Sequence, residues 1–164
     1  MSWNTCDLCD VNEAAMVAGT LAVLPPPWLS FGQRGRFSGQ AATLKVFEDN
    51  VMVRNALSLP GNGRVLVIDA GGSTRCAMVG GNLAQLAVTN GWAGIVLDGC
   101  VRDSDELDAC AIGIRAIGVH PRRSHRHGAG QADAPVMIGA VTIRPGDWVY
   151  ADRDGVVVSH VRLG

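Results

Sequence analysis

The middle third of the chain alternates short apolar runs with segments of helical periodicity. Each run is continuous and bounded by turn residues, as in a strand that is buried on both faces. We expect these strands over residues 65–68, 94–97 and 112–117. Between the first two, Leu83, Leu86 and Ala87 share one helical face, and a second short helix over 104–110 precedes the third strand. Strands that alternate with helices predict a parallel β-α-β-α-β segment with right-handed crossovers.

The segments before this centre have weaker patterns. A first helix is expected through residues 14–17, with Thr5 or Asp7 as its N-cap and Gly19 at its end. Three prolines, 25–27, then open a loop, and the polar stretch 31–39 is punctuated by glycine. Two further elements are expected before the centre: a strand over 41–47 and a short helix through Leu57 that Asp49 or Asn50 caps.

The last third of the chain changes character, because its apolar runs are separated by tight-turn dipeptides. Pro145-Gly146 and Asp154-Gly155 are such turn signals, and runs joined in this way are typically antiparallel. We expect these strands over residues 135–143, 147–151 and 156–160. The whole chain, 1–164, is therefore expected to form one mixed α/β domain, with a small β-barrel or sandwich element beside the parallel segment.

Composition supports a folded chain and adds one unusual feature, which is glycine. Hydrophobic residues make up 48% of the 164 residues and charged residues only 18%, which excludes a disordered chain. Glycine occurs 21 times, above the usual share of about 7%, and without the Gly-X-Y period of collagen. These glycines must serve turns, close packing or backbone contacts to a ligand.

The charge balance gives no sign of a general nucleic-acid-binding surface. Lys and Arg total 14 against 15 Asp and Glu, for a formal net charge of −1, so we expect no direct nucleic-acid partner. One basic segment contains Arg122, Arg123, His125, Arg126 and His127. It is either an anion- or RNA-binding patch or a solvated loop, and the second interpretation is favoured because no aromatic residues interleave it.

Cysteine usage and hydropathy predict a soluble, cytoplasmic protein. The five cysteines follow no secretory segment and are odd in number, which argues against a disulfide framework. Cys6-x-x-Cys9 is half of a zinc-ribbon pattern without a second pair, so buried thiols are favoured over a metal or redox site. The apolar run at 21–24 is cut by proline and is far shorter than the roughly 18 residues that cross a bilayer, so no membrane partner is expected.

Several widespread catalytic motifs are absent from the sequence. It contains no Gly-x-Gly-x-x-Gly after a strand, no Gly-Lys-Ser/Thr loop, no Gly-x-Ser-x-Gly elbow and no His-Glu-x-x-His. Dinucleotide, P-loop, α/β-hydrolase and zinc-protease chemistry therefore lose support.

Candidate chemistry lies where the parallel strands end, because ligands of such sheets bind at the carboxyl ends of the strands. Gly71-Gly72-Ser73 follows the first strand, and Gly80-Gly81-Asn82-Leu83 follows it at the start of the next helix. The backbone N–H groups of Gly80, Gly81, Asn82 and Leu83 suit a carboxylate or a phosphate. The alternative is that Gly80 and Gly81 only allow the helix to pack tightly on the sheet.

The second strand end carries Gly99-Cys100-Val101-Arg102-Asp103. Arg102 suits a substrate carboxylate, because a guanidinium binds one through two parallel hydrogen bonds. Asp103 offers oxygen ligands to Mg²⁺ or Mn²⁺, which keep several waters and use one or two protein carboxylates. The alternative is structural: Asp103-x-x-Glu106 fits a capping box for the next helix, with Arg102 solvated.

At these residues the chain resembles the family of the regulator of ribonuclease activity A. That family includes the class II 4-hydroxy-4-methyl-2-oxoglutarate aldolases and was once misnamed a menaquinone methyltransferase. The central spacing is specific to this family: Gly81 is followed by twenty residues, then by Arg102-Asp103 and by Glu106. The remaining matches are Asp7-Leu8-Cys9-Asp10, Phe47-Glu48-Asp49-Asn50, residues 65–73, Asn90-Gly91-Trp92, Tyr150-Ala151-Asp152 and Asp154-Gly155.

The resemblance implies a swivelling β/β/α fold, like that of phosphohistidine domains, and a homotrimer or a dimer of trimers with the active site at a subunit boundary. It implies aldol cleavage of 4-hydroxy-4-methyl-2-oxoglutarate to pyruvate and decarboxylation of oxaloacetate, both through a pyruvate enolate. The alternative that the same family implies is a protein that inhibits ribonuclease E and alters RNA degradation.

The resemblance also implies roles for individual residues. The amides of Gly80, Gly81, Asn82 and Leu83 would hold the 2-oxo acid substrate. Arg102 would bind its carboxylate and keto region, and Asp103 would ligate Mg²⁺ or Mn²⁺. The chain keeps this metal ligand but departs from the family's aldolases at Gly81, where they carry an acid.

Overall fold

The computed structural model describes residues 2–25 and 27–164, so Pro26 of the expected proline loop lies outside the described residues. The helices are α1 (Thr5–Val11), α2 (Glu13–Ala18), α3 (Val51–Leu57), α4 (Gly81–Thr89) and α5 (Ser104–Asp108). The strands are β1 (Leu21–Val23), β2 (Leu29–Phe31), β3 (Phe37–Lys45), β4 (Val65–Asp69), β5 (Ala77–Val79), β6 (Gly94–Val101), β7 (Gly113–Val119), β8 (Gln131–Ala132), β9 (Val136–Ile138), β10 (Val141–Ile143), β11 (Trp148–Ala151) and β12 (Val156–Ser159).

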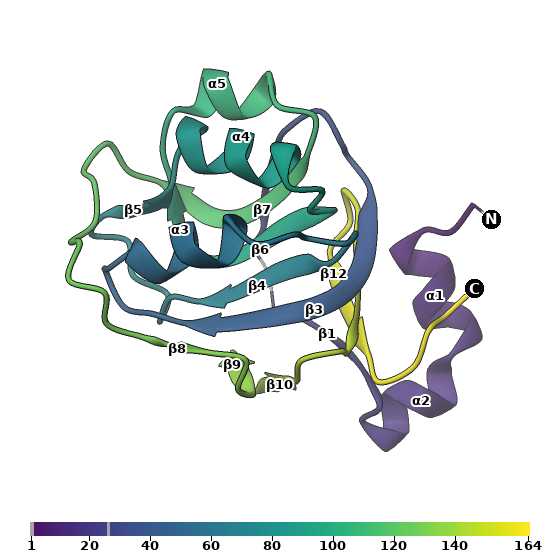
Figure 1. The fold of residues 1–164 in the computed structure, drawn as a ribbon. Helices are drawn as coiled ribbons and strands as arrows, with labels where there is room; N and C mark the ends of the chain where they lie inside the picture. The colour runs from purple at the N-terminus through teal and green to yellow at the C-terminus, as the bar shows by residue number, and fades with distance from the viewer. Residues whose placement is uncertain (1, 26) are drawn as a thin grey trace.

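A parallel sheet of β3, β4, β6 and β7 forms the centre, as the alternation of strands and helices predicts. The helices α3, α4 and α5 cover one face of this sheet, and the β9–β10 hairpin lies on the opposite side (Figure 1). The sheet then continues through antiparallel strands, with β11, β12 and β1 beyond β3 and with β2 beyond β7. The mixed α/β fold with a parallel segment and antiparallel strands is therefore confirmed.

Two apolar layers explain why the central strands are continuous hydrophobic runs. Along β4, Leu66 and Ile68 pack with the buried faces of the helices, whereas Val65 and Val67 pack with the strands of the antiparallel part. A strand covered on both faces buries every side chain, and all five residues of β4 are buried.

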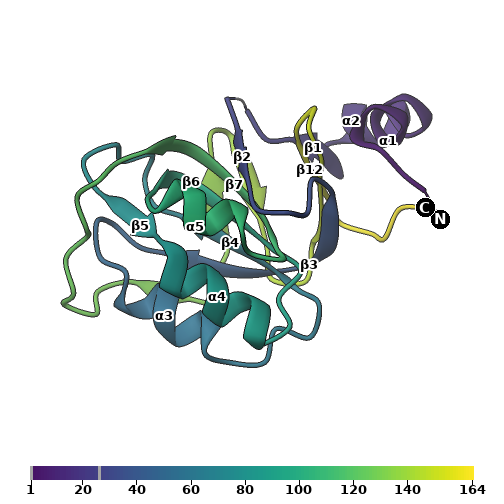
Figure 2. The ribbon, with the colours of Figure 1, turned by 90° about the horizontal axis from the view of Figure 1, so that it is seen from above.

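The N-terminal residues form two short helices rather than one. Asn4 caps α1 by accepting a hydrogen bond from the Asp7 N–H (2.7 Å), so the expectation of Thr5 or Asp7 as the cap is wrong. Thr5 instead donates its N–H and its hydroxyl to the buried Asp152 carboxylate (both 2.7 Å), which ties the arm to the C-terminal hairpin. Gly19 ends α2 in the left-handed conformation, as predicted. Seen from above, α1 and α2 lie to one side of the sheet, near both chain ends (Figure 2).

The expected polar loop over 31–39 is partly strand, because β3 begins at Phe37. Glycine suggested a loop there, but Gly39 serves packing: a Cβ at this position would overlap the carbonyl oxygen of Gly63. The expected single strand over 135–143 is likewise a hairpin, since the chain turns at Gly139, whose φ of 59° lies in the left-handed region.

The second central strand is longer than its apolar run. β6 continues through Asp98 and Gly99 to Val101, with an irregular register between Leu97 and Cys100. Gly99 therefore lies inside the strand and not after it, and a Cβ there would lie 3.1 Å from the Cβ of Ala70. The short β5, which the sequence did not suggest, pairs with this extension and brings the start of α4 beside Arg102.

All five cysteines are free, and three of them are buried. The expectation of buried thiols is wrong for Cys6, which is exposed, and Cys9 is only half-buried. Within the described part of the chain, no helix is both long and apolar enough to span a bilayer.

Candidate functional site

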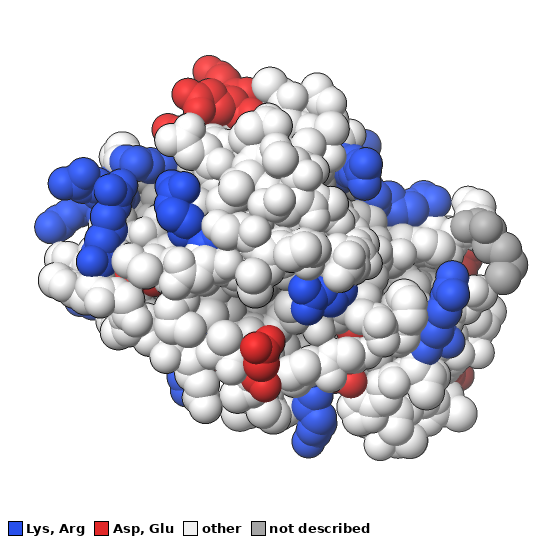
Figure 3. Space-filling view, in the orientation of Figure 1, with Lys and Arg blue, Asp and Glu red and all other residues white. Residues whose placement is uncertain are grey.

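A narrow cleft of about 60 Å³ lies where β5 and β6 end. It gathers four arginines around one carboxylate, that of Asp103. The residues that line it are Asn50, Arg54, Ala77, Met78, Gly80, Asn82, Leu83, Arg102, Asp103, Arg123 and Arg126. Arginine side chains gather at this edge of the molecule, over β5 and the loop that follows β7 (Figure 3). The cleft is therefore suited to an anionic ligand.

The start of α4 contributes backbone N–H groups to this cleft. The first intrahelical hydrogen bond runs from the Ala84 N–H to the Gly80 carbonyl (3.0 Å), so the N–H groups of Asn82 and Leu83 have no partner within the helix. The Gly81 N–H is already used, because it donates to Asp103 Oδ2 (3.0 Å). Asn82 and Leu83 can thus bind a ligand carboxylate through their amides, whereas Gly81 positions Asp103.

Asp103 adopts a left-handed conformation with φ of 58° and ψ of 48°. Its side chain makes no cap bond to α5, so the alternative of a capping box is wrong. The unusual backbone turns the carboxylate back toward α4, where a Cβ at Gly80 would lie only 2.6 Å from Oδ2. A non-glycine residue held in this region costs free energy, and such conformations cluster at functional sites.

The side chain of Arg102 packs against Gly80, as the Asp103 carboxylate does. A Cβ at Gly80 would lie 3.3 Å from Arg102 Cγ and 3.6 Å from its Nε. The Arg102 N–H donates to the Val79 carbonyl (3.0 Å), which fixes the residue at the end of β5. The structure therefore brings Gly80, Asn82, Leu83, Arg102 and Asp103 together at one cleft.

The sequence suggested Glu106 as part of a capping box and as part of the family spacing, and the structure places it against Gly81. A Cβ at residue 81 would overlap Glu106 Oε2 and would lie 3.0 Å from the Glu106 Cβ. The glycine is therefore needed for packing as well, since a side chain there would displace the carboxylate. The spacing of Asp103 and Glu106, three residues apart at a helix start, is the sequence signal that could have suggested a shared site.

The loop after β4 is not part of the cleft, although the sequence places it at a strand end. The Gly71 N–H donates to Asp69 Oδ1 and the Gly72 N–H to the Asp98 carbonyl (both 3.0 Å). Ser73 donates its hydroxyl to Glu48 (2.7 Å), which also pairs with Arg75. None of Gly71, Gly72 and Ser73 lines the cleft.

The basic segment after β7 is held against the cleft rather than left as a free loop. The Arg122 carbonyl accepts from the Ala77 N–H (2.7 Å), and Arg123 forms a β-bridge with Ala77. Asp49, which is 3% exposed, accepts at Oδ2 from the N–H groups of His127 (2.8 Å) and Gly128 (2.9 Å). Arg123 and Arg126 are thereby presented to the cleft, which the sequence alone did not indicate.

The donor set fits one kind of metal ion. Within residues 2–25 and 27–164, no three His, Cys, Asp or Glu side chains gather as a closed metal site. A zinc site of the usual kind is thus not formed there. A single carboxylate in a polar cleft, Asp103, suits Mg²⁺ or Mn²⁺, which retain most of their water.

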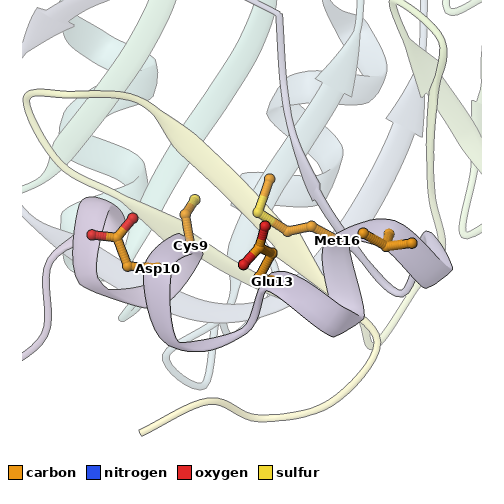
Figure 4. A pocket seen from close by; sticks show the side chains of 5 residues that line it. Cys9, Asp10, Glu13 and Met16 are labelled. Carbon is orange, nitrogen blue, oxygen red and sulfur yellow. The ribbon is translucent and has the colours of Figure 1, made fainter.

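A wider cavity of about 710 Å³ lies on the N-terminal arm, away from these residues. Figure 4 shows its side chains on the two short helices, with Cys9 and Asp10 from α1 and Glu13 and Met16 from α2. Burial raises the pKa of the Cys9 thiol, so it stays protonated at neutral pH. A shallow site with two carboxylates and no cation does not suit an anionic substrate.

Comparison with known proteins gives a consistent result. A family model described as RraA-like, Aldolase/RraA, matches residues 5–158. A protein of Cupriavidus necator named "Putative 4-hydroxy-4-methyl-2-oxoglutarate aldolase" is 58% identical over 160 residues, which cover 98% of this chain and 97% of that protein. A protein of the same name from Burkholderia mallei is 60% identical over 163 residues, 99% of each chain.

Two solved structures share the fold over nearly the whole chain. One, from Geobacillus kaustophilus, is described as an S-adenosylmethionine: 2-dimethylmenaquinone methyltransferase and has a TM-score of 0.92 at 45% identity, covering 98% of this chain and 97% of the other. The other is a Thermus RNA-processing inhibitor, RraA, with a TM-score of 0.92 at 41% identity, covering 100% of this chain and 96% of the other.

Proposed function

This chain belongs to the RraA-like family, and from that membership we propose that it is a divalent-metal-dependent lyase of 2-oxo acids. It cleaves 4-hydroxy-4-methyl-2-oxoglutarate to pyruvate and decarboxylates oxaloacetate. The observation that carries this proposal is the meeting of Arg102, Asp103 and the start of α4 at one anion-binding cleft. The names of the Cupriavidus and Burkholderia relatives support it.

The substrate's 2-oxo acid end is bound by this chain's own groups. Arg102 holds the carboxylate and keto oxygens, and the N–H groups of Asn82 and Leu83 complete the contact. Asp103 would hold Mg²⁺ or Mn²⁺, which when bound would supply Lewis-acid stabilisation of the charge that develops on the enolate oxygen.

In the aldol substrate, the bond between C3 and C4 breaks and its electron pair passes into the pyruvate enolate. The C4 hydroxyl loses its proton and becomes the carbonyl of the second product, and the enolate carbon then takes up a proton. We assign the acceptance and return of that proton to Glu106, whose carboxylate lies beside Gly81 at the start of α4. In oxaloacetate the same bond breaks, CO₂ leaves, and the same enolate forms.

The test is pyruvate release from both substrates by the full chain with Mg²⁺, measured through lactate dehydrogenase and NADH. We expect release from both and loss of at least about 100-fold in kcat/KM for Arg102→Gln, because a charge-assisted carboxylate contact is removed. Arg144→Gln, an exposed arginine away from the cleft, is the matched control. Absence of release from both substrates would contradict the proposal.

A second candidate function is inhibition of ribonuclease E, and it is favoured by the 41% identity with an RNA-processing inhibitor. The basic segment at 122–127 is the surface we assign to it. In a pull-down at micromolar concentration, ribonuclease E should then no longer bind the variant Arg122/Arg123/Arg126→Ala, whereas it should still bind Arg144→Ala. If wild type is not captured at all, this second function is wrong.

We also propose that the protein works in the cytoplasm as a homotrimer, or as a dimer of trimers, as its resemblance implies. Light scattering during size-exclusion chromatography gives the molar mass in solution and so distinguishes these states from a monomer.

A further inference from the structure

Three arginines that the proposed reaction does not use line the same cleft as Arg102. Arg54 comes from α3, and Arg123 and Arg126 come from the segment after β7. In the part of the chain that the structure describes, the one salt bridge joins Arg75 to Glu48. None of the three arginines therefore has a carboxylate partner there. Four arginines thus line a cleft in which Asp103 supplies the one carboxylate.

These side chains project from backbone that is fixed on both sides of the cleft. Val53 and Leu57 are fully buried and anchor α3 beneath Arg54. The segment that carries Arg123 and Arg126 is held by hydrogen bonds to the Ala77 N–H and to the buried Asp49 carboxylate. Little ordering of the backbone is therefore needed when a ligand binds, which favours specific recognition over a diffuse basic surface.

The 2-oxo acid end needs only one of the four arginines. In the proposed reaction Arg102 and the amides of α4 bind one carboxylate and its keto group, and Asp103 would hold the metal ion. We propose that Arg54, Arg123 and Arg126 form a second anion subsite, which binds the distal carboxylate of a dicarboxylic 2-oxo acid. This inference rests on the proposed function, and it adds the residues that select the substrate.

The subsite has a consequence for the choice between the two reactions. In aldol cleavage the distal carboxylate remains a carboxylate on the leaving fragment, so its contacts persist. In decarboxylation the distal carboxylate becomes neutral CO₂, and guanidinium contacts to the ground state are lost as the reaction proceeds. The arginines therefore favour aldol substrates, because only contacts kept in the transition state lower the barrier.

The experiment measures binding with two stable ligands of equal length, in the presence of Mg²⁺. 2-Oxoglutarate carries the distal carboxylate, and 2-oxovalerate has a methyl group in its place. By calorimetry, wild type should bind 2-oxoglutarate at least about tenfold more tightly. Arg54→Gln and Arg123→Gln should each reduce that ratio severalfold without changing 2-oxovalerate affinity. Arg122→Gln, a neighbour outside the cleft lining, should preserve the ratio.

Equal affinity of wild type for the two ligands would overturn the subsite, and so would an unchanged ratio in both variants. Melting temperatures within a few degrees of wild type show that the exposed Arg54 and Arg123 were changed without unfolding the chain. Neither ligand is cleaved, so the preference is measured without turnover. If wild type prefers 2-oxoglutarate but releases pyruvate from neither substrate, the proposed lyase reaction is wrong and the subsite stands. If it releases pyruvate but shows no preference for 2-oxoglutarate, the subsite is wrong and the reaction stands.

Discussion

The carboxylate of Glu106 lies against Gly81, in the volume that a side chain at residue 81 would occupy. The resemblance to the family's aldolases implies an acid at position 81, where this chain has glycine. Here a carboxylate reaches that position from Glu106, in the first turn of α5. Glycine at 81 and glutamate at 106 are therefore one structural unit, and they must be tested together.

Moving the acid back to α4 tests that unit. Glu106→Ala should lower kcat/KM for the aldol substrate by about 100-fold, the range typical of a lost general acid–base group. Adding Gly81→Asp to Glu106→Ala should restore much of the activity, because the new carboxylate fills the vacated volume. Gly81→Asp alone should lower the melting temperature, since Glu106 must move, at a cost of about 1 kcal/mol. Asp105→Ala, on the same exposed turn, is the control, and full activity of Glu106→Ala would show that this acid has no role.

Replacement of Asp103 separates its charge from its hydrogen bond. Asp103→Asn keeps an oxygen that can accept from the Gly81 N–H but removes the negative charge that holds a cation. We expect pyruvate release to fall by at least about 100-fold while the melting temperature changes by only a few degrees. The assay and a thermal melt on the same sample measure both. Retention of metal-dependent activity by Asp103→Asn would place the metal elsewhere.

Removal of divalent cations should abolish pyruvate release from both substrates. After EDTA treatment and dialysis, Mg²⁺ or Mn²⁺ should restore activity, because a single carboxylate with water-filled coordination suits these ions. Added Mg²⁺ should also stabilise wild type by about 2–3 kcal/mol at a hundredfold excess over its dissociation constant. The Asp103→Asn protein should show no such stabilisation, and activity that survives EDTA would exclude this mechanism.

Asp49 should make the basic segment sensitive to acid. Burial acts to raise the pKa of Asp49, but hydrogen bonds from the N–H groups of Val51, His127, Ala129 and Gly128 outweigh it and lower the pKa. The ionised form is therefore favoured in the folded state. The contribution of the ionised Asp49 to the free energy of unfolding is present above its unfolded pKa of about 4. It is lost as the pH falls toward the lower pKa of the folded state.

Asp49→Ala should accordingly reduce the free energy of unfolding by about 2 kcal/mol at pH 7. The difference from wild type should shrink below about pH 4, as measured by urea unfolding across pH. Asp10→Ala, at an exposed carboxylate, serves as the control. A difference that stays constant from pH 7 to pH 3 would mean that the Asp49 charge does not hold the segment.

Local patterns were sufficient for the central elements and insufficient at their ends. The strands β4 and β7 and the helix α4 follow from apolar runs and helical spacing, which depend on neighbouring residues only. β5 is three residues long and forms only by pairing with the irregular end of β6, so no local pattern marks it. Gly39 suggested a loop and Gly99 the end of a strand, but both lie within strands, where two backbone segments or small side chains touch.

The sequence by itself determined that the start of α4 and the pair Arg102-Asp103 would meet, because parallel strands bring their carboxyl ends to one edge of a sheet. Only the tertiary structure decided what these residues touch. The left-handed backbone at Asp103 turns its carboxylate to Gly81, and the packing of α5 on α4 places Glu106 there. The approach of Arg54 and Arg123 to the cleft likewise depends on segments far apart in the chain, since side-chain direction is set by local dihedrals and by packing that a linear pattern does not contain.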